Sequence, residues 1–483
     1  MRRLGKGILA VALALVLVAP ARAEVTAEQA AGVERDLRGW IAGLLAPLVE
    51  AGQIPVKISA AGERYRMDLG SVPLPGFNMT SEGQTTGFLR SPAEGRWVVE
   101  DLMFPARMNV TMGDDKALVF AVRLGEQKAR LEIDTTLASP SKFEWQYGNV
   151  EYSSKGGPGS GVTRMTKVTM TGLLTPGADG RMKATGESRV SGYDHKLTTP
   201  DGSTVALKAR EIVATSHGEG LSPQRFDATV RTAAQLASNV QTNPMPDNGP
   251  TPAQRTMLHA LLDHVTDLFS SLETEQTWSG VSMAAEGMTG SVAKVKLGNS
   301  IGAPDGKAEF GMKLEVEGFA SPMLPKGGIS ELLPKRLALA PRVSGLKKAD
   351  MVALLSRAID TVGDDDADVA GDAMHLLAGN PAVISLDTFD IDIGGAKLRG
   401  TAAVNVASPD NVTGTGELRM TGLDALMRSV AKVPEAAMAA PVLLMLKGLG
   451  EQKGAETVWR ITYAENTLLV NGQDVSALMA GAK

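Results

Sequence analysis

Two-residue alternation of apolar and polar side chains, repeated in many segments, is the feature that most limits the folds open to this chain. The apolar residues Ala308, Phe310, Met312, Leu314 and Val316 are each separated by one residue that is polar or Gly. The same pattern recurs over 131–137, 181–190, 397–406 and 415–421. A side-chain period of two indicates a strand with one buried and one wet face, as in antiparallel sheet, whereas parallel sheets need continuous apolar runs. We therefore predict an α+β, β-dominated fold of long antiparallel meander sheets with amphipathic helices packed on one face.

Irregularities and turns between these segments can also be located. The apolar positions shift by one residue between Leu386 and Phe389, which predicts a β-bulge there. Pro-Asp-Gly at 200–202 and at 304–306 predicts tight hairpin turns, and Gly-rich segments at 156–159 and 178–180 also separate alternating runs.

Helical periodicity is less frequent. An apolar stripe predicts a helix over 26–49. A second helix is predicted over 252–272, where Thr251 as N-cap, Pro252 at the first position and Gln254 at the third form a capping box. Further helices are predicted over 347–361, 367–377 and 423–446, the last with a break near Pro434.

A breaker-rich segment near the middle predicts the domain organisation. Residues 242–250 contain three Pro, two Asn and a Gly, and a long amphipathic helix precedes a block of strands on each side of them. We predict an N-terminal helix-plus-sheet module over 24–241, a linker over 242–250 and a C-terminal module of the same kind over 251–483. No internal repeat is strong enough to establish a duplication.

The first 23 residues read as a secretory signal peptide. Arg2, Arg3 and Lys6 precede an apolar run over 8–18, and Ala21–Ala23 has the small-x-small pattern of a cleavage site after Ala23. The alternative is a retained anchor, but the run is shorter than the ~18 residues that a membrane span requires, and no later segment reaches that length. We therefore predict a periplasmic protein without a transmembrane segment after cleavage. Cleavage removes four cations, which changes the net charge from −5 to −9.

Composition excludes several functional classes. The absence of Cys excludes disulfides, thiolate metal sites and Cys nucleophiles, and only five His are present. The slightly acidic balance of 49 basic against 54 acidic residues lacks the excess of positive charge typical of nucleic-acid binders. No cofactor and no nucleic-acid partner are predicted.

Serine and histidine residues are the first candidates for a nucleophile or for metal ligands, and each also has a structural interpretation. Ser160 lies in a Gly-rich turn and not in a strand-to-helix nucleophile elbow. His259 and His264 are five residues apart, so they do not share a helix face as an i, i+4 zinc pair would. The other histidines, His195, His217 and His375, stand alone in the sequence.

Carboxylates provide two further possibilities. The acidic run 364–366 with Asp368 offers oxygen ligands for Ca²⁺ but lacks EF-hand spacing, and acids before a helix also serve as caps. A carboxylate pair of a glycoside hydrolase stays open, although 5 Trp and 5 Tyr are few for a sugar site. We predict no catalytic residues and no metal site, and the ligand-binding residues stay unknown.

The apolar face of the strands is the most informative feature for function. It is built from Leu, Val, Ala, Gly and Met, and the chain has 22 Met. Met and small aliphatic side chains form adaptable surfaces that suit acyl chains. The same residues would also form an ordinary closed core, so an open groove and a closed core are both compatible with the sequence.

Several segments of the second half resemble an uncharacterised family of bacterial periplasmic envelope proteins that is distantly AsmA-like. The segments are 332–339 and 343–346, the block "GTGELRMTGLDAL" over 414–426, and the tail over 457–479. The resemblance implies repeated amphipathic strands and a link to envelope lipid homeostasis, and it supplies no catalytic residues. AsmA-like proteins usually keep an N-terminal membrane anchor, from which a cleavable signal departs.

Together these patterns predict a non-enzymatic periplasmic protein that binds a lipid-like apolar ligand or an envelope partner along a sheet face. Two alternatives stay open: a purely structural or interaction module of the cell envelope, and a carboxylate-based hydrolase. An outer-membrane barrel is disfavoured because 4% aromatic residues are too few for two interfacial girdles.

Overall fold

The structure is a computed structural model, and it describes most of the chain from Glu24 to Ser476. The described residues are 24–45, 55–71, 77–112, 117–137, 140–156, 159–177, 180–246, 249–303, 306–321, 328–363, 368, 371, 381–408 and 411–476. The predicted signal peptide at 1–23 and the acidic run 364–366 lie outside them. The predicted helix at 367–377 also lies outside them, apart from residues 368 and 371.

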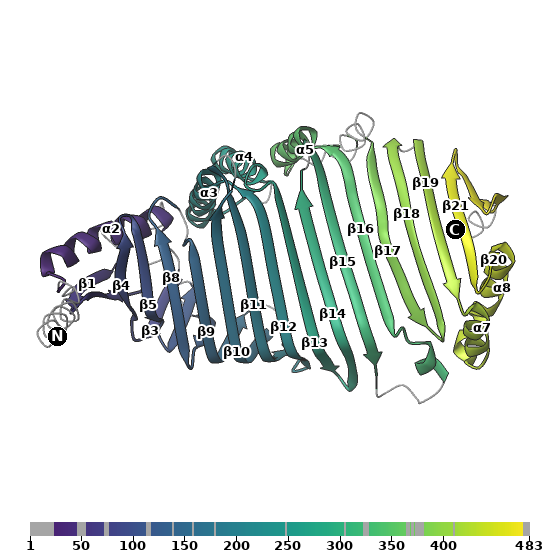
Figure 1. Ribbon diagram of the computed structural model, residues 1–483, viewed down its shortest axis with the longest axis horizontal. Coiled ribbons are helices and arrows are strands. Elements are labelled where there is room, and N and C mark those ends of the chain that lie inside the picture. Colours follow the sequence, from purple (N-terminus) through teal and green to yellow (C-terminus); the bar gives the residue numbers. More distant parts are fainter. Residues whose placement is uncertain are drawn as a thin grey trace, which may run out of the picture.

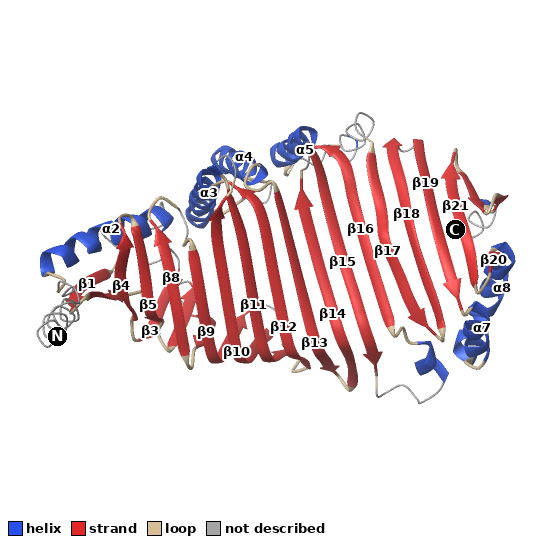
Figure 2. Ribbon diagram, in the orientation of Figure 1, coloured by secondary structure: helices blue, strands red, loops and turns tan. Residues whose placement is uncertain are grey.

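Most of the described chain is one long, open antiparallel sheet of 23 strands (Figures 1 and 2). Its main part is a meander in which twelve long strands pair in the order of the chain, interrupted only by the short strand β20. These strands are β9 (Lys142–Gly156), β10 (Gly159–Pro176), β11 (Met182–Thr198), β12 (Thr204–Leu221), β13 (Ser271–Ala285), β14 (Met288–Gly302), β15 (Lys307–Ala320), β16 (Arg336–Lys347), β17 (Ala382–Ile393), β18 (Ala396–Ser408), β19 (Asn411–Thr421) and β21 (Glu456–Ala464).

The sheet forks at β9. On the edge of β9 away from β10, the first half of the strand pairs with β8 and the second half with β7. One branch continues through β8, β5, β4, β2 and β1, and the other through β7, β6 and β3. The strands are β1 (Val56–Ala61), β2 (Arg64–Leu69), β3 (Phe77–Glu82), β4 (Thr85–Ala93), β5 (Arg96–Met103), β6 (Arg107–Met112), β7 (Ala117–Arg123) and β8 (Gln127–Asp134).

Three short strands complete the other end of the sheet. Both β20 and β22 pair with β21, and β23 pairs with β22. Their bounds are β20 (Glu451–Lys453), β22 (Thr467–Val470) and β23 (Gln473–Asp474).

The helices lie at the ends of the strands and at the two ends of the sheet. In Figure 1, α3, α4 and α5 lie along the upper strand ends, α2 lies over the first branch, and α7 and α8 lie beside the last long strands. Four strands separate α4 from α5, whereas three separate α5 from α7, so α7 begins at the opposite strand ends. The helices are α2 (Ala27–Leu45), α3 (Pro223–Thr242), α4 (Pro252–Thr266), α5 (Lys348–Thr361), α7 (Leu423–Ala431) and α8 (Ala440–Leu449), with 3₁₀ segments η4 (Gly328–Leu332) and η5 (Pro434–Ala439).

The predicted dominance of long antiparallel strands is confirmed, and so are several local details. The register between β17 and β18 shifts between Leu386 and Phe389, where the bulge was predicted. The capping box of α4 is present, with the Thr251 hydroxyl accepting from the Gln254 amide. The turn at 200–202 connects β11 to β12 as a hairpin.

Other details differ from the prediction. The helix expected over 252–272 ends at Thr266, because Ser271 and Leu272 already pair with Gly302 and Ile301 as the first residues of β13. The helix α3 was not predicted, although Ser222 caps it. The predicted packing of helices on one face of the sheet is not shown by the described helices α3, α4 and α5, which lie beside strand ends.

The predicted linker at 242–250 connects α3 to α4. The strands on either side of this helix pair, β12 and β13, are hydrogen-bonded neighbours over most of their length. A single sheet therefore runs through both halves of the chain, and the division into two modules stays a prediction.

Candidate functional site: an uncovered apolar sheet face

Directly paired residues in an antiparallel sheet lie on the same face, so the registers define both faces of the meander. One cross-strand row from Tyr147 in β9 to Met420 in β19 contains only apolar residues. Between these two it consists of Val168, Val190, Ile212, Trp278, Val295, Val316, Leu337, Ile391 and Leu398. With a strand spacing of ~4.8 Å, the row is roughly 50 Å long. We call the face that carries this row the apolar face.

The next row on the apolar face continues the same chemistry. It contains Leu297, Leu314, Leu339, Phe389, Leu418 and Trp459, with small residues between the aliphatic groups. From β14 to β19 the face is thus apolar in two neighbouring rows, whereas over β11 and β13 the second row contains the polar residues Ser188 and Gln276.

A line of left-handed residues crosses β9 to β15 in every second strand. Asn149, Gly192, Gly280 and Gly318 all have φ between 51° and 67°. They are in register: a Cβ on Gly192 would contact Thr166 of β10, one on Gly280 would contact Arg210 of β12, and one on Gly318 would contact Ala293 of β14. The alternation of apolar and polar residues alone did not predict this line.

The left-handed line keeps apolar side chains on one face where the alternation would otherwise change sides. Tyr147 and Val150 are three residues apart, yet both are buried in one cluster with Val168. Tyr193 lies just beyond Gly192, and its ring contacts that of Trp278 at 5.6 Å between centroids. The apolar face therefore continues on both sides of the line. Burial raises the pKa of Tyr147 to about 12.

Within the described ranges, helices cover the apolar face only at its two ends. At the first end, Ala30, Val33 and Leu37 of α2 form a buried cluster with residues of β1, β2, β4, β5 and β8. At the other end, Leu423, Leu426 and Val430 of α7 pack on β18, β19 and β21.

The middle of the apolar face is open in the part of the chain that the structure describes. Four large side chains that belong to it keep much of their surface exposed: Leu297 40%, Ile301 52%, Met312 65% and Ile384 46%. The sequence left open whether this face is a closed core or a groove, and over β14 to β17 it is uncovered by the described residues.

A hollow of about 410 Å³ lies on this face between β9 and β14. Phe143 and Met170 line one side of it and Leu297 the other, and between them lie the small residues Gly186 and Ala214 together with polar residues that include Ser188, Ser216, Thr274 and Gln276. The hollow therefore has apolar side chains at its two ends and mostly small or polar side chains between them.

The opposite face is charged and carries ladders of ion pairs. Lys296 binds Glu275 at 2.7 Å, and Lys313 binds Glu315 at 3.0 Å. The Lys313 ammonium group lowers the pKa of Glu315, chiefly by hydrogen bonding. Arg336 and Arg399 both lie 3.5 Å from Asp390. Because its charged side chains form ion pairs and remain accessible to water, this face can be exposed to solvent.

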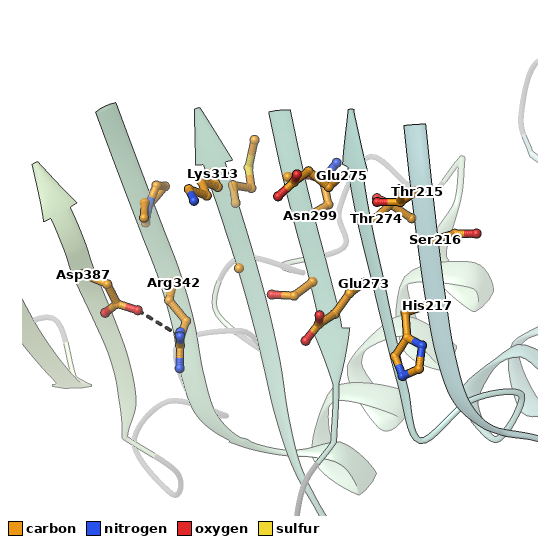
Figure 3. Close-up of a pocket in the computed structure, with 16 residues that line it drawn as sticks. Thr215, Ser216, His217, Glu273, Thr274, Glu275, Asn299, Lys313, Arg342 and Asp387 are labelled. Atoms are coloured by element: carbon orange, nitrogen blue, oxygen red, sulfur yellow. Dashed lines mark ion pairs between the residues drawn. The ribbon is translucent and has the colours of Figure 1, made fainter. Parts of the chain in front are cut away.

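A polar hollow of about 450 Å³ extends over β12 to β17 (Figure 3). His217, Glu273 and Arg342 belong to a cross-strand row of the charged face, and Arg342 forms an ion pair with Asp387 at 3.0 Å. Acidic and basic groups alternate along the hollow. The arrangement contains no hydroxyl nucleophile held by a base.

The carboxylates give little support to the predicted hydrolase alternative. A glycosidase acid requires a raised pKa. Among the described carboxyl groups with a clearly shifted pKa, the shift is downward in each case, caused first by side-chain hydrogen bonds: Glu144, Asp201, Glu219, Asp267, Glu315, Asp424 and Asp474.

Of the four candidate histidines that the structure describes, His259 is the one that contacts both a serine and an aspartate. Its Nδ1 lies 3.0 Å from the Ser356 hydroxyl and its Nε2 lies 2.7 Å from Asp360. Ser356 and Asp360 are one turn apart on α5, so the three side chains tie α4 to α5. The Asp360 side chain is 58% exposed, and the hollows described above do not include the three residues. We assign the group a structural role.

The other candidates lie apart from one another. Ser160 is an exposed residue of β10. His264 contacts the Arg225 guanidinium at 3.2 Å, and His195 Nδ1 lies 2.8 Å from the Thr163 hydroxyl. His375 lies outside the described residues. No group of three or more potential metal ligands occurs among the described residues.

Comparisons with known proteins identify no relative. No protein-family model, no curated protein and no solved structure matches the chain. No helix within the described ranges is long and apolar enough to cross a membrane.

Proposed function

We propose that this chain is a non-enzymatic periplasmic protein that binds a lipid-like apolar ligand along the apolar face. The observation that carries the proposal is the open middle of this face, where Leu297, Ile301, Met312 and Ile384 are 40–65% exposed. Large contiguous apolar patches on a protein surface mark interaction sites. The polar environment of the opposite face means that only one side of the sheet suits such a ligand.

The shape of the open region favours an elongated ligand over a compact one. The apolar rows cross twelve strands, while the hollow on this face is shallow and extends over six of them. An acyl chain laid along the rows would contact Leu, Val, Met and Phe side chains, which adapt to flexible chains. The resemblance of 332–339, 343–346 and 414–426 to a distantly AsmA-like envelope family supports the same class of ligand.

The proposal is tested by lipid extraction and mass spectrometry on protein purified from a periplasm, followed by titration with a fluorescent long-chain fatty acid. We expect copurified lipid and saturable probe binding. The double variant L297D/M312D should weaken probe binding at least tenfold, which corresponds to ~1.4 kcal/mol. Because Leu297 is half-buried and Met312 is largely exposed, we expect the free energy of unfolding to fall by about 1–2 kcal/mol, which leaves the protein folded in the binding assay.

A matched control places two carboxylates on the charged face. T169D and T277D each put an acid opposite a cation, Arg189 and Lys296 respectively. This double variant should bind the probe as the wild type does. Absence of both lipid and probe binding, or equal loss in the two double variants, would contradict the proposal and favour a purely structural or interaction module.

A further inference from the structure

The helix α8 at the C-terminal end of the sheet is apolar on all sides but buried on only one. Its sequence, APVLLMLKGL, has a single charged residue, Lys447. A helix with such a composition is normally enclosed by protein or lipid. Here Ala440, Leu443 and Leu449 pack against the cluster formed with α7. The remaining apolar side chains of this segment face solvent.

The exposed side chains form a patch, which we call the α8 patch. Their exposed fractions reach 88% for Met438 of η5, immediately before the helix. The members are Met438 88%, Val442 52%, Leu444 58%, Met445 40% and Leu446 37%. Five large apolar residues in nine consecutive positions are more than the isolated exposed residues normal for a protein surface.

Positive charges flank the α8 patch. Arg428 of α7 and Lys432, the residue that follows this helix, are exposed, and Lys447 of α8 binds Asp424 of α7 at 2.7 Å. Lys447 and Arg428 both lower the pKa of Asp424, which indicates that Arg428 also lies near this pair. Lys447 thus lies within the segment of the patch, Arg428 lies near it and Lys432 follows at the end of α7, and Asp424 neutralises Lys447.

This combination matches the chemistry of an anionic membrane surface. Interfacial helices bury an apolar side at the boundary of headgroups and acyl chains, and their Lys and Arg side chains bind anionic lipids. The ten residues of α8 are about 15 Å long, half of what a membrane span needs. A second copy of the chain fits less well, because a two-fold contact would bring the same cations together.

We propose that the α8 patch is a membrane-docking surface that inserts into the interfacial region of a bilayer containing anionic phospholipid. The patch is fixed to the sheet, since the Trp459 indole N–H of β21 donates to the Leu446 carbonyl at 2.7 Å. Trp459 belongs to the apolar face. Docking would therefore set the end of the apolar face against the bilayer, and only this orientation rests on the proposed function.

The test is flotation of the purified protein with vesicles of phosphatidylglycerol and phosphatidylcholine, and with vesicles of phosphatidylcholine alone. We expect binding to the anionic vesicles that weakens with added salt. The double variant L444Q/M445Q should reduce this binding at least tenfold, and R428Q/K432Q should reduce it and remove its salt dependence. M283Q/M288Q, which changes two exposed Met of the β13–β14 hairpin, should bind as the wild type does.

Three results would overturn the proposal. They are no binding of the wild type to either vesicle, equal loss in M283Q/M288Q, and self-association that L444Q/M445Q abolishes in protein that does not bind vesicles. Circular dichroism of each variant checks that the fold is retained. Vesicle binding and fatty-acid binding are separate readouts, so failure of docking is distinguishable from failure of the proposed function.

Discussion

At the scale of single residues, the left-handed line across β9 to β15 shows how a few backbone conformations control a whole face. Gly192, Gly280 and Gly318 adopt positive φ, where side chains with a Cβ are strained. Each occupies the second position after an apolar residue of the long row: Val190, Trp278 and Val316. An apolar residue, a polar residue and then Gly within an alternating run is thus the local sequence pattern that could have revealed the line.

Replacing Gly318 with Ala should destabilise the protein. The new Cβ would lie 2.6 Å from the Cβ of Ala293 and would also occupy a left-handed conformation. We expect a loss of about 1–3 kcal/mol in the free energy of unfolding, measured by urea denaturation. Gly290 of β14 has room for a Cβ, so Gly290→Ala is the control and should change stability little. Equal effects of the two substitutions would contradict this account of the line.

At the scale of elements, side-chain contacts between α4 and α5 hold the helices along the strand ends. Asp267, at the C-terminus of α4, accepts a hydrogen bond of 2.6 Å from the Lys348 ammonium group at the start of α5. This contact is the largest cause of the lowered pKa of Asp267. Farther along the helices, His259 joins Ser356 and Asp360.

Replacing Lys348 with Met should reduce stability at neutral pH but not in acid. Because folding lowers the pKa of Asp267 below its usual value near ~3.9, the contact contributes fully above that pH and is lost as the pH falls through the folded-state pKa. Both side chains are partly exposed, so we expect less than ~1 kcal/mol at pH 7. Urea denaturation at a series of pH values from 7 down to about 2 checks this; a difference that does not decline as the pH falls below ~3.9 would contradict it.

At the scale of the whole molecule, helix clusters pack on the apolar face at both ends of the sheet, and the described residues leave the part between them uncovered. The buried clusters of α2 and of α7 contain several fully buried residues, whereas the apolar residues over β14 to β17 are mostly half-buried. Local opening requires less free energy where fewer apolar contacts are broken. The two ends should therefore be more rigid than the middle.

Hydrogen exchange measured by mass spectrometry can check this difference. Amides of β4 and β5 beneath α2, and of β18 and β19 beside α7, should exchange more slowly than amides of β14 to β16. Addition of a long-chain fatty acid should slow exchange in the middle strands and leave the ends unchanged. Uniform protection along the sheet would show that the apolar face contributes nothing to local stability differences.

Local patterns allowed much of the fold to be predicted, since the strands alternate and the bulge after Leu386 and the capping box at Thr251 depend on neighbouring residues alone. The end of α4 was placed too far because Leu268 and Leu272 continue its apolar spacing, while pairing of Leu272 with Ile301 assigns it to β13. The helix α3 was missed because its apolar stripe consists largely of small residues such as Ala234.

The residues of the candidate site were visible in the sequence, but its openness was not. Leu314 and Val316 were assigned to an apolar face from their spacing. Whether another layer covers that face depends on where helices distant in the sequence pack. The spacing of residues along one strand does not determine those positions. The continuous pairing of β12 with β13 is likewise a long-range property, separated by two helices.

The count of strands between helices, four before α5 and three before α7, has a consequence for how such a protein can change in length. Insertion or deletion of one hairpin would alter the apolar face by ~10 Å, given the ~4.8 Å strand spacing, and would leave each later helix at its original end of the strands. A single added strand would instead transfer every later helix to the opposite margin. The length of the apolar face can thus change in steps of two strands while the helix clusters of α2 and α7 keep their positions at the two ends of the sheet.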